Sequence, residues 1–157
     1  ESHVFLSLML LDQILIPEIY VPNVGATFRG AALELLTHEV QHNVKKTTDE
    51  QKGDWRPLLF LMTDGSPSDV YAYQQIVPVI QQLNFASIIA CAAGPKAKTE
   101  FLLQLTNQVV VLDTMDSNSF SSFFKWVSAS VVAGSSSAGV TDSISLPPPP
   151  SEIQLVL

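Results

Sequence analysis

The stretch LLFLMTDGSPSD, residues 58–69, is the most informative part of the sequence for the fold because it joins an unbroken apolar run to a polar turn. An apolar run without polar alternation is typical of a strand that is buried on both faces of a parallel sheet. The turn contains Asp64, Ser66 and Ser68. Ligands bind at the carboxyl ends of the strands in such sheets, so Asp64 is the first candidate for a functional residue.

Similar apolar runs alternate with amphipathic segments along the rest of the chain. We expect further strands at residues 4–11, 14–21, 86–93 and 109–112, and helices at residues 28–46, 71–83, 99–106 and 119–132. This alternation predicts an α/β fold, a Rossmann-like, doubly wound, mostly parallel sheet with helices on both faces. Asp116 or Ser117 is the predicted cap of the last helix.

Two of the helices have apolar residues at helical spacing, which predicts the side chains that they bury. In the helix at 28–46 these are Ala32, Leu35, Leu36, Val40 and Val44, and in the helix at 119–132 they are Phe120, Phe123, Phe124, Val127 and Val131. Pro78 is expected to kink the helix at 71–83 or to begin part of it, because proline lacks the backbone donor.

The composition indicates a globular protein that does not bind nucleic acid. The chain has 157 residues, of which 46% are hydrophobic and 15% are charged, with a formal net charge of −7. Its basic residues are scattered, whereas binding to phosphates needs clustered Lys and Arg. The apolar N-terminal stretch is interrupted by Asp12, Pro17 and Glu18, short of the roughly 20 residues that a membrane span needs. We therefore expect no membrane span.

The single cysteine and the C-terminal composition bear on location and on domain organisation. Cys91 lies in the apolar run ASIIACAAG, so we expect a buried thiol; the lack of a disulfide fits a reducing compartment, and we expect a cytoplasmic location. We expect one domain at residues 1–133 and a Ser/Pro-rich linker and tail at 134–157, in which SEIQLVL forms a short strand. The tail either docks on its own domain or connects to a partner or neighbouring domain.

A zinc-protease signature, HEVQH, occurs at residues 38–42. In that chemistry His38 and His42 ligate zinc and Glu39 acts as the base. Both histidines, however, fall on the polar side of the predicted helix, and the following carboxylates lie in a polar loop, so a third ligand is missing. We interpret the motif as solvent-facing helix residues and keep zinc hydrolysis as an alternative.

A second metal signal combines Asp64 with the loop Gly25-Ala26-Thr27, which precedes the helix at 28–46. Mg²⁺ prefers hard oxygen ligands and keeps several waters, so a carboxylate and a hydroxyl suit it. Few protein carboxylates leave such an ion electrophilic, and it can then accept an acidic side chain from another protein. The candidate metal ligands are therefore Thr27 and Asp64, with Mg²⁺ or Mn²⁺ as the ion.

With these motifs the chain resembles a von Willebrand factor A (VWA) domain with its metal-ion-dependent adhesion site. GDWRPLLFLMTDGSPSD, FFKWVSASV and LPPPPSEIQLV are similar to the TerY-type subgroup associated with bacterial tellurite resistance. The resemblance covers nearly the whole chain. It implies that Thr27 corresponds to the family's loop threonine and Asp64 to the aspartate that ends its fourth strand.

One part of the family's metal site has no counterpart in the sequence. The resemblance implies an Asp-x-Ser-x-Ser on a first strand, and none precedes Val4. Residues 64–68 fit that motif by spacing, but no later threonine loop and Asp-Gly strand end support that register, so we keep Asp64 on the fourth strand. Three accounts remain open: an upstream segment absent from this sequence, a rearranged sheet, or a degenerate protein.

The resemblance implies a non-catalytic protein-binding module in bacterial tellurite resistance and stress signalling. Its partner would be another protein that completes the metal site with an acidic side chain, and a protein kinase and a metal-dependent phosphatase are implied as possible partners. The alternatives are a degenerate VWA domain with a structural or scaffolding role and, third, a zinc metalloprotease that uses HEVQH.

Overall fold

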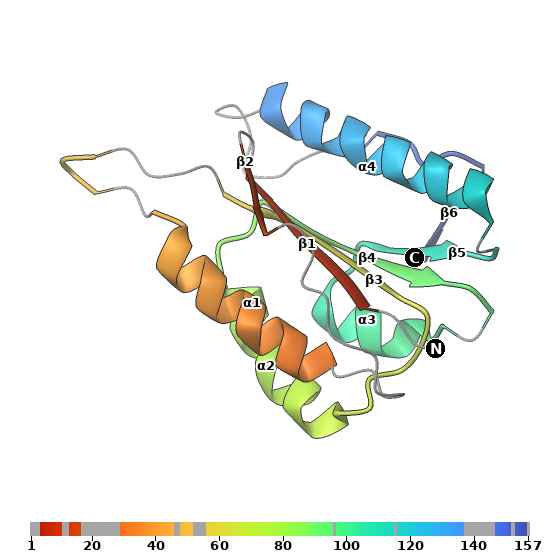
Figure 1. Cartoon of the computed structure of the whole chain (residues 1–157), viewed down its shortest axis with the longest axis horizontal. Coiled ribbons are helices and arrows are strands. Elements are labelled where there is room, and N and C mark those ends of the chain that lie inside the picture. The colour runs from red at the N-terminus through yellow and green to blue at the C-terminus, as the bar shows by residue number, and fades with distance from the viewer. Residues whose placement is uncertain are drawn as a thin grey trace.

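The computed structural model describes residues 4–10, 13–16, 29–45, 48–51, 56–95, 97–114, 116–136, 147–151 and 153–156, with the backbone alone for residues 4–10, 13–16 and 133–136. The elements are β1 (Val4–Leu10), β2 (Gln13–Ile16), α1 (Arg29–Asn43), β3 (Leu58–Thr63), α2 (Val70–Gln82), β4 (Ser87–Ala93), α3 (Thr99–Leu105), β5 (Val109–Leu112), α4 (Ser117–Ser136) and β6 (Ile153–Val156) (Figure 1). The predicted α/β class is confirmed.

The described strands form one sheet in the order β2-β1-β3-β4-β5-β6. β3, β4 and β5 are parallel, which matches their continuous apolar sequences and the helices that connect them. β1 is antiparallel to both β2 and β3, and β6 is antiparallel to β5. The sheet is therefore mixed, with a parallel centre and antiparallel flanks.

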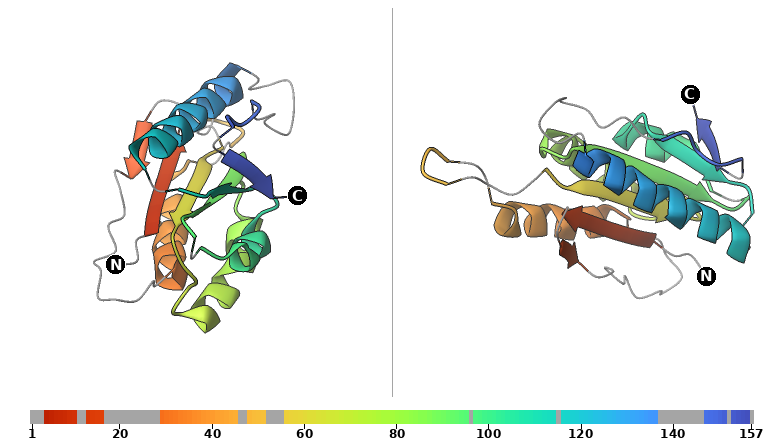
Figure 2. Two further views of the ribbon diagram at one scale, coloured as in Figure 1. Left: turned by 90° about the vertical axis from the view of Figure 1, so that its right-hand side faces the viewer. Right: turned by 90° about the horizontal axis from the view of Figure 1, so that it is seen from above.

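Helices cover both faces of the sheet, and each face has its own core. α1, α2 and α3 lie on one face and α4 lies on the other (Figure 2). The first core joins these three helices to alternate residues of the central strands, among them Leu59, Leu61 and Ala90. The second joins α4 to the intervening residues, among them Phe60 and Cys91. The period-two alternation of each strand thus distributes one apolar sequence between two cores.

The predicted inner faces of α1 and α4 are correct except at one position each. Leu35 is 47% exposed and Phe124 is 57% exposed, so both predictions were wrong. The large apolar residues that the prediction missed and that are buried are Leu33 in α1 and Trp126 in α4. In both helices the apolar stripe is wider than the surface that the sheet can cover, so one large side chain remains at its margin.

The start of α4 confirms the predicted cap. Asp116 Oδ1 accepts hydrogen bonds from the backbone N–H groups of Asn118 and Ser119, each at 2.9 Å, and Thr114 donates to the second carboxylate oxygen. These bonds satisfy amides that lack partners in the first helical turn. The backbone hydrogen bond from Ser119, followed by that from the Thr114 hydroxyl, lowers the pKa of Asp116 below its usual value.

The strand predicted within SEIQLVL is present as β6, which pairs with β5 and buries Ile153. Trp126 donates from Nε1 to the carbonyl oxygen of Pro147 at 2.9 Å, which ties the segment before β6 to α4. Pro78 lies within α2, which continues through it to Gln82. Within the described ranges, every helix is too short or too polar to cross a bilayer.

Candidate functional site at the carboxyl end of β3

The turn after β3 is the part of the described structure where the predicted site residue Asp64 lies. Thr63 ends the strand and is buried, while Asp64, Gly65 and Ser66 are half-buried. The turn leads into α2, and the first residues of α1 lie against the same turn. Asp64 is therefore at the carboxyl end of a central parallel strand, as the sequence predicts.

A buried arginine organises this turn, and its burial was not predicted from the sequence. Arg29, the first residue of α1, has no exposed surface. Its Nη2 donates to Thr63 Oγ1 at 2.7 Å and also to the carbonyl oxygen of Gly65. Arg29 therefore binds the two residues that flank Asp64 in the chain. Arginine at the start of a helix is ordinarily a surface residue, so hydropathy alone could not identify this one.

The guanidinium of Arg29 lies over the ring of Tyr73, 5.6 Å from its centroid, which is within the range of a cation–π interaction. The hydroxyl of Tyr73 in turn donates to the carbonyl oxygen of Phe101 at 2.5 Å. Burial raises the pKa of Tyr73, with the nearby positive charge of Arg29 acting in the opposite direction. The aromatic ring is thus held in place by α3 while it covers the cation.

Burial and the neighbouring side chains act in opposite directions on the pKa of Arg29. Burial lowers the pKa of Arg29, and the attraction of Tyr73, Asp69 and Asp64 raises it. The guanidinium of arginine is not deprotonated in proteins, so the group remains charged at neutral pH. Nε and Nη1 of Arg29 have no hydrogen-bond partner among the described residues. The Asp64 carboxylate therefore sits in the field of a fixed, buried positive charge.

Asp69 joins the turn to α1 by a second bond. Its Oδ2 accepts a hydrogen bond from the backbone N–H of Ala31 at 2.9 Å, and it makes no side-chain cap bond to α2, the helix that it precedes. A carboxylate at the first turn of a helix satisfies an unpaired amide and complements the helix dipole. The Asp69 side chain therefore binds the first turn of α1, although its position directly before α2 suggests a cap for α2.

The two helices approach each other closely at this point because Gly30 lacks a side chain. A Cβ atom at Gly30 would lie 2.5 Å from the backbone nitrogen of Tyr73 and 2.8 Å from the carbonyl carbon of Ala72. By contrast, a Cβ atom at Gly65 would meet nothing within 4 Å. Gly30 thus permits the α1–α2 contact that brings Arg29 to the end of β3.

The second predicted metal ligand, Thr27, lies outside the described residues, as do Gly25 and Ala26. The nearest described position in the sequence is Arg29, two residues later, and its contacts are those given above. Asp64 and Ser66 offer the hard oxygen donors that suit Mg²⁺ or Mn²⁺. The donor chemistry of this turn therefore fits such an ion, whereas the charge of Arg29 opposes its binding.

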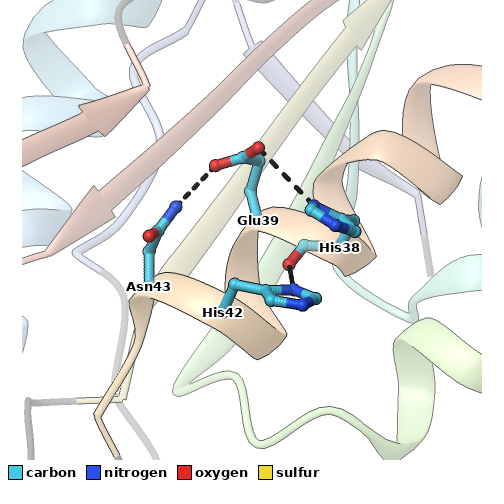
Figure 3. A network of polar contacts seen from close by, with 4 residues as sticks. All are labelled: His38, Glu39, His42 and Asn43. Atoms are coloured by element: carbon cyan, nitrogen blue, oxygen red, sulfur yellow. Dashed lines mark hydrogen bonds and ion pairs between the residues drawn. The ribbon is translucent and has the colours of Figure 1, made fainter.

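His38, Glu39 and His42 of the HEVQH motif lie elsewhere, on α1 (Figure 3), while its Val40 is buried in the core. His38 and His42 are exposed, and Glu39 accepts a hydrogen bond from Asn43 Nδ2 at 2.6 Å. Across the described part of the chain, no three His, Cys, Asp or Glu side chains are grouped so that they could hold a metal. The exposed position predicted for both histidines is confirmed.

Cys91 is fully buried in β4 and is a free cysteine, as predicted. Burial raises the pKa of its thiol to about 12. The thiolate, which is the nucleophile and metal ligand, is therefore essentially absent at neutral pH.

Compared with protein-family models, curated proteins and solved structures, the chain matches none of them. The functional assignment consequently depends on the residues and contacts described above.

Proposed function

We propose that this chain is a VWA-type, non-catalytic protein-binding module that engages an acidic side chain of another protein through Mg²⁺ or Mn²⁺. Thr27 and Asp64 are the proposed protein ligands, and water fills the positions that they leave. The proposed setting is bacterial tellurite resistance and stress signalling, with a protein kinase or a metal-dependent phosphatase as partners. The motifs that resemble the TerY-type subgroup support this setting.

The observation that carries the proposal is the pair of contacts between α1 and the turn after β3. Arg29 binds Thr63 and Gly65, which flank Asp64, and Ala31 binds Asp69 at the end of the same turn. These contacts support a site shared by the start of α1 and the end of β3. A half-buried carboxylate at the end of a central strand is also a suitable position for a ligand-binding residue.

A metal-independent scaffolding role is the second candidate, and Arg29 favours it. A buried guanidinium near Asp64 supplies positive charge that a divalent ion would otherwise supply. Repulsion between two cations lowers the affinity for Mg²⁺, most strongly where water is excluded. The two candidates therefore differ in whether Asp64 binds a metal at all.

Calorimetric titration of the chain with Mg²⁺ and Mn²⁺ separates these candidates. If the proposal is correct, the unmodified chain binds the metal ion and the Asp64→Asn variant does not, because this change removes the charge of the side chain and keeps its size. Asp113→Asn is the matched control, since Asp113 also follows a strand of the sheet but is exposed and accepts a hydrogen bond from Gln154. Absence of heat for the unmodified chain would favour the scaffolding role.

Partner capture tests the rest of the proposal. A tagged chain should retain its partner in Mg²⁺ and release it in EDTA, and Asp64→Ala should abolish retention without changing the folded far-UV spectrum. Retention that survives both Asp64→Ala and EDTA would reject the metal-dependent mechanism.

A further inference from the structure

His38 and His42 form a pair on α1 that the proposed function does not use. Their rings stack with centroids 4.0 Å apart and an angle of 23° between the planes (Figure 3). The His38 side chain is 63% exposed and His42 is also exposed, so both rings are accessible. One helical turn separates them, which places their Cβ atoms side by side on one stripe of the helix.

Hydrogen bonding fixes which ring nitrogen of His42 is free. Its Nδ1 lies 2.7 Å from the carbonyl oxygen of His38. A carbonyl oxygen accepts and cannot donate, so Nδ1 carries the proton in this contact and Nε2 of the neutral ring keeps its lone pair. Metal-bound histidines commonly have this arrangement, in which one nitrogen donates to a carbonyl and the other binds the ion.

Glu39 supplies the corresponding support for His38. Its Oε1 lies 3.7 Å from His38 Nδ1, and its Oε2 accepts a hydrogen bond from Asn43 Nδ2 at 2.6 Å. Asn43 therefore holds the carboxylate, which in turn favours a proton on Nδ1 of His38. At 3.7 Å this contact is electrostatic and is not a hydrogen bond, so it favours, but does not fix, the tautomer in which Nε2 of His38 keeps its lone pair. In this arrangement Glu39 orients a ligand, which differs from the catalytic base of the HExxH mechanism.

We propose that His38 and His42 form a two-ligand site for a borderline divalent transition metal, with Cu²⁺ preferred over Ni²⁺ and Zn²⁺. Imidazole nitrogen suits these ions, and the order follows the general ranking of divalent metals, in which Cu²⁺ is bound most tightly. Two nitrogen ligands of one such ion lie no more than about 4 Å apart, since each bond is about 2.0–2.1 Å long. The ring centroids are 4.0 Å apart, and the stacking holds the two ring planes nearly parallel, so rotation of the side chains is needed to turn both Nε2 lone pairs toward one ion.

The site has open coordination positions because the helix provides two ligands. Water or a ligand from a second molecule completes the shell, as four-coordinate Zn²⁺ requires. Mg²⁺ is excluded, since it prefers oxygen ligands in an octahedron. The site is thus distinct from the proposed Asp64 site both in position and in the metals that it selects.

The test is a titration of the full chain with Cu²⁺ in a buffer that does not bind metals, carried out in a His3→Ala background. That background removes the third histidine of the sequence, which is a competing ligand. One Cu²⁺ per chain is expected. His38→Ala and His42→Ala should each lower the affinity by more than the roughly tenfold that loss of an orienting partner such as Glu39 costs. Gln41→Ala is the control, because Gln41 is exposed on the same turn.

Electron paramagnetic resonance of the Cu²⁺ complex supplies a readout that depends on the ligands themselves. Nitrogen hyperfine structure from two imidazoles is expected, with one remaining in each single variant. Asp64→Asn should leave Cu²⁺ binding unchanged, and excess Mg²⁺ should not displace the ion. Unchanged affinity in both histidine variants, or no Cu²⁺ binding in the His3→Ala chain, would overturn the proposal whatever the outcome at Asp64.

Discussion

Arg29 and Thr63 are joined by a 2.7 Å hydrogen bond from Nη2 to Oγ1 although 34 positions separate them in the chain. Both residues are buried, with 0% and 1% of their surface exposed. The first residue of α1 is therefore hydrogen-bonded to the last residue of β3 in the interior of the protein. A buried hydrogen bond from a charged donor is stronger than one between neutral groups, so this contact is a principal link between the two elements.

Removal of Arg29 tests the strength of that link. Arg29→Ala is expected to lower the free energy of unfolding by about 3 kcal/mol, because it creates a cavity and leaves Gly65 O and Thr63 Oγ1 without their charged donor. Arg29→Met also removes the charge but keeps most of the volume, so it leaves a smaller cavity and its loss should be smaller than that of Arg29→Ala. Urea unfolding measures the free energy of unfolding of both Arg29 variants.

Lys98→Ala is the control for this series, because Lys98 is exposed and a surface change of this kind is expected to stay within about 0.5 kcal/mol. Equal losses in Arg29→Met and Arg29→Ala would contradict the expected contribution of the cavity.

The close contact at Gly30 gives a prediction with a matched control in the same site. Gly30→Ala should destabilise the protein by about 1–3 kcal/mol, because the new methyl group would overlap the backbone of Ala72 and Tyr73 and force α1 away from α2. Gly65→Ala places its methyl group in open space and should change the free energy of unfolding by less than about 0.5 kcal/mol. The midpoints of thermal unfolding of the two variants are compared. Similar midpoints would refute the expected overlap of the Gly30→Ala methyl group with the α2 backbone.

Cys91 predicts a loss of stability in alkaline solution. Its pKa is raised to about 12 in the folded protein by burial, whereas the thiol of the unfolded chain ionises near its ordinary value. The stabilising contribution is complete below the unfolded pKa and is lost as the pH rises from there toward 12, with a slope of up to about 1.4 kcal/mol per pH unit.

Comparison with Cys91→Ala isolates this effect, because other groups, including Tyr73, also titrate in alkaline solution. Urea unfolding of both proteins at several pH values above 8 should show a steeper decline for the unmodified chain. Parallel declines would show that the thiol is not protected by the fold. A thiol reagent should likewise modify Cys91 after unfolding and leave it unmodified in the folded protein.

The cap of α4 predicts that the stability contribution of Asp116 changes in acid solution. Because hydrogen bonds lower the pKa of Asp116 in the folded state, its contribution is present above the unfolded pKa and is lost as the pH falls through the folded pKa. Asp116→Ala should therefore lower the unfolding midpoint at neutral pH. In strong acid the midpoints of the variant and of the unmodified protein should lie closer together. Asp116→Asn, which can still accept the amide bonds, should lose less at neutral pH. A constant difference across the pH range would argue against the charged cap.

The sequence was most informative where one physical requirement acts alone. The strands β3 and β5 were predicted at residues 58–63 and 109–112, where they occur, because burial on both faces demands an unbroken apolar run. The direction of β1 and β6 was not predictable in this way, since an apolar run is the same in a parallel and in an antiparallel pair. Strand order depends on contacts between distant segments, for which a single sequence carries no local pattern.

The candidate site was predictable in part for a similar reason. Asp64 could be placed at a strand end from its neighbours alone. Arg29 and Asp69 could not be assigned, because their partners are 34 and 38 positions away and their residue types usually indicate surface positions. Whether Thr27 lies beside Asp64 stays a prediction, because Thr27 is outside the described residues.

The pairing of β5 with β6 has a consequence for how the protein is made. β5 is complete at Leu112, but its outer neighbour begins at Ile153. Until that later segment emerges from the ribosome, the open side of β5 presents unpaired amides and carbonyls to the surroundings. Such an edge is a template for pairing with other nascent chains, so synthesis that stalls between these two segments should favour aggregation.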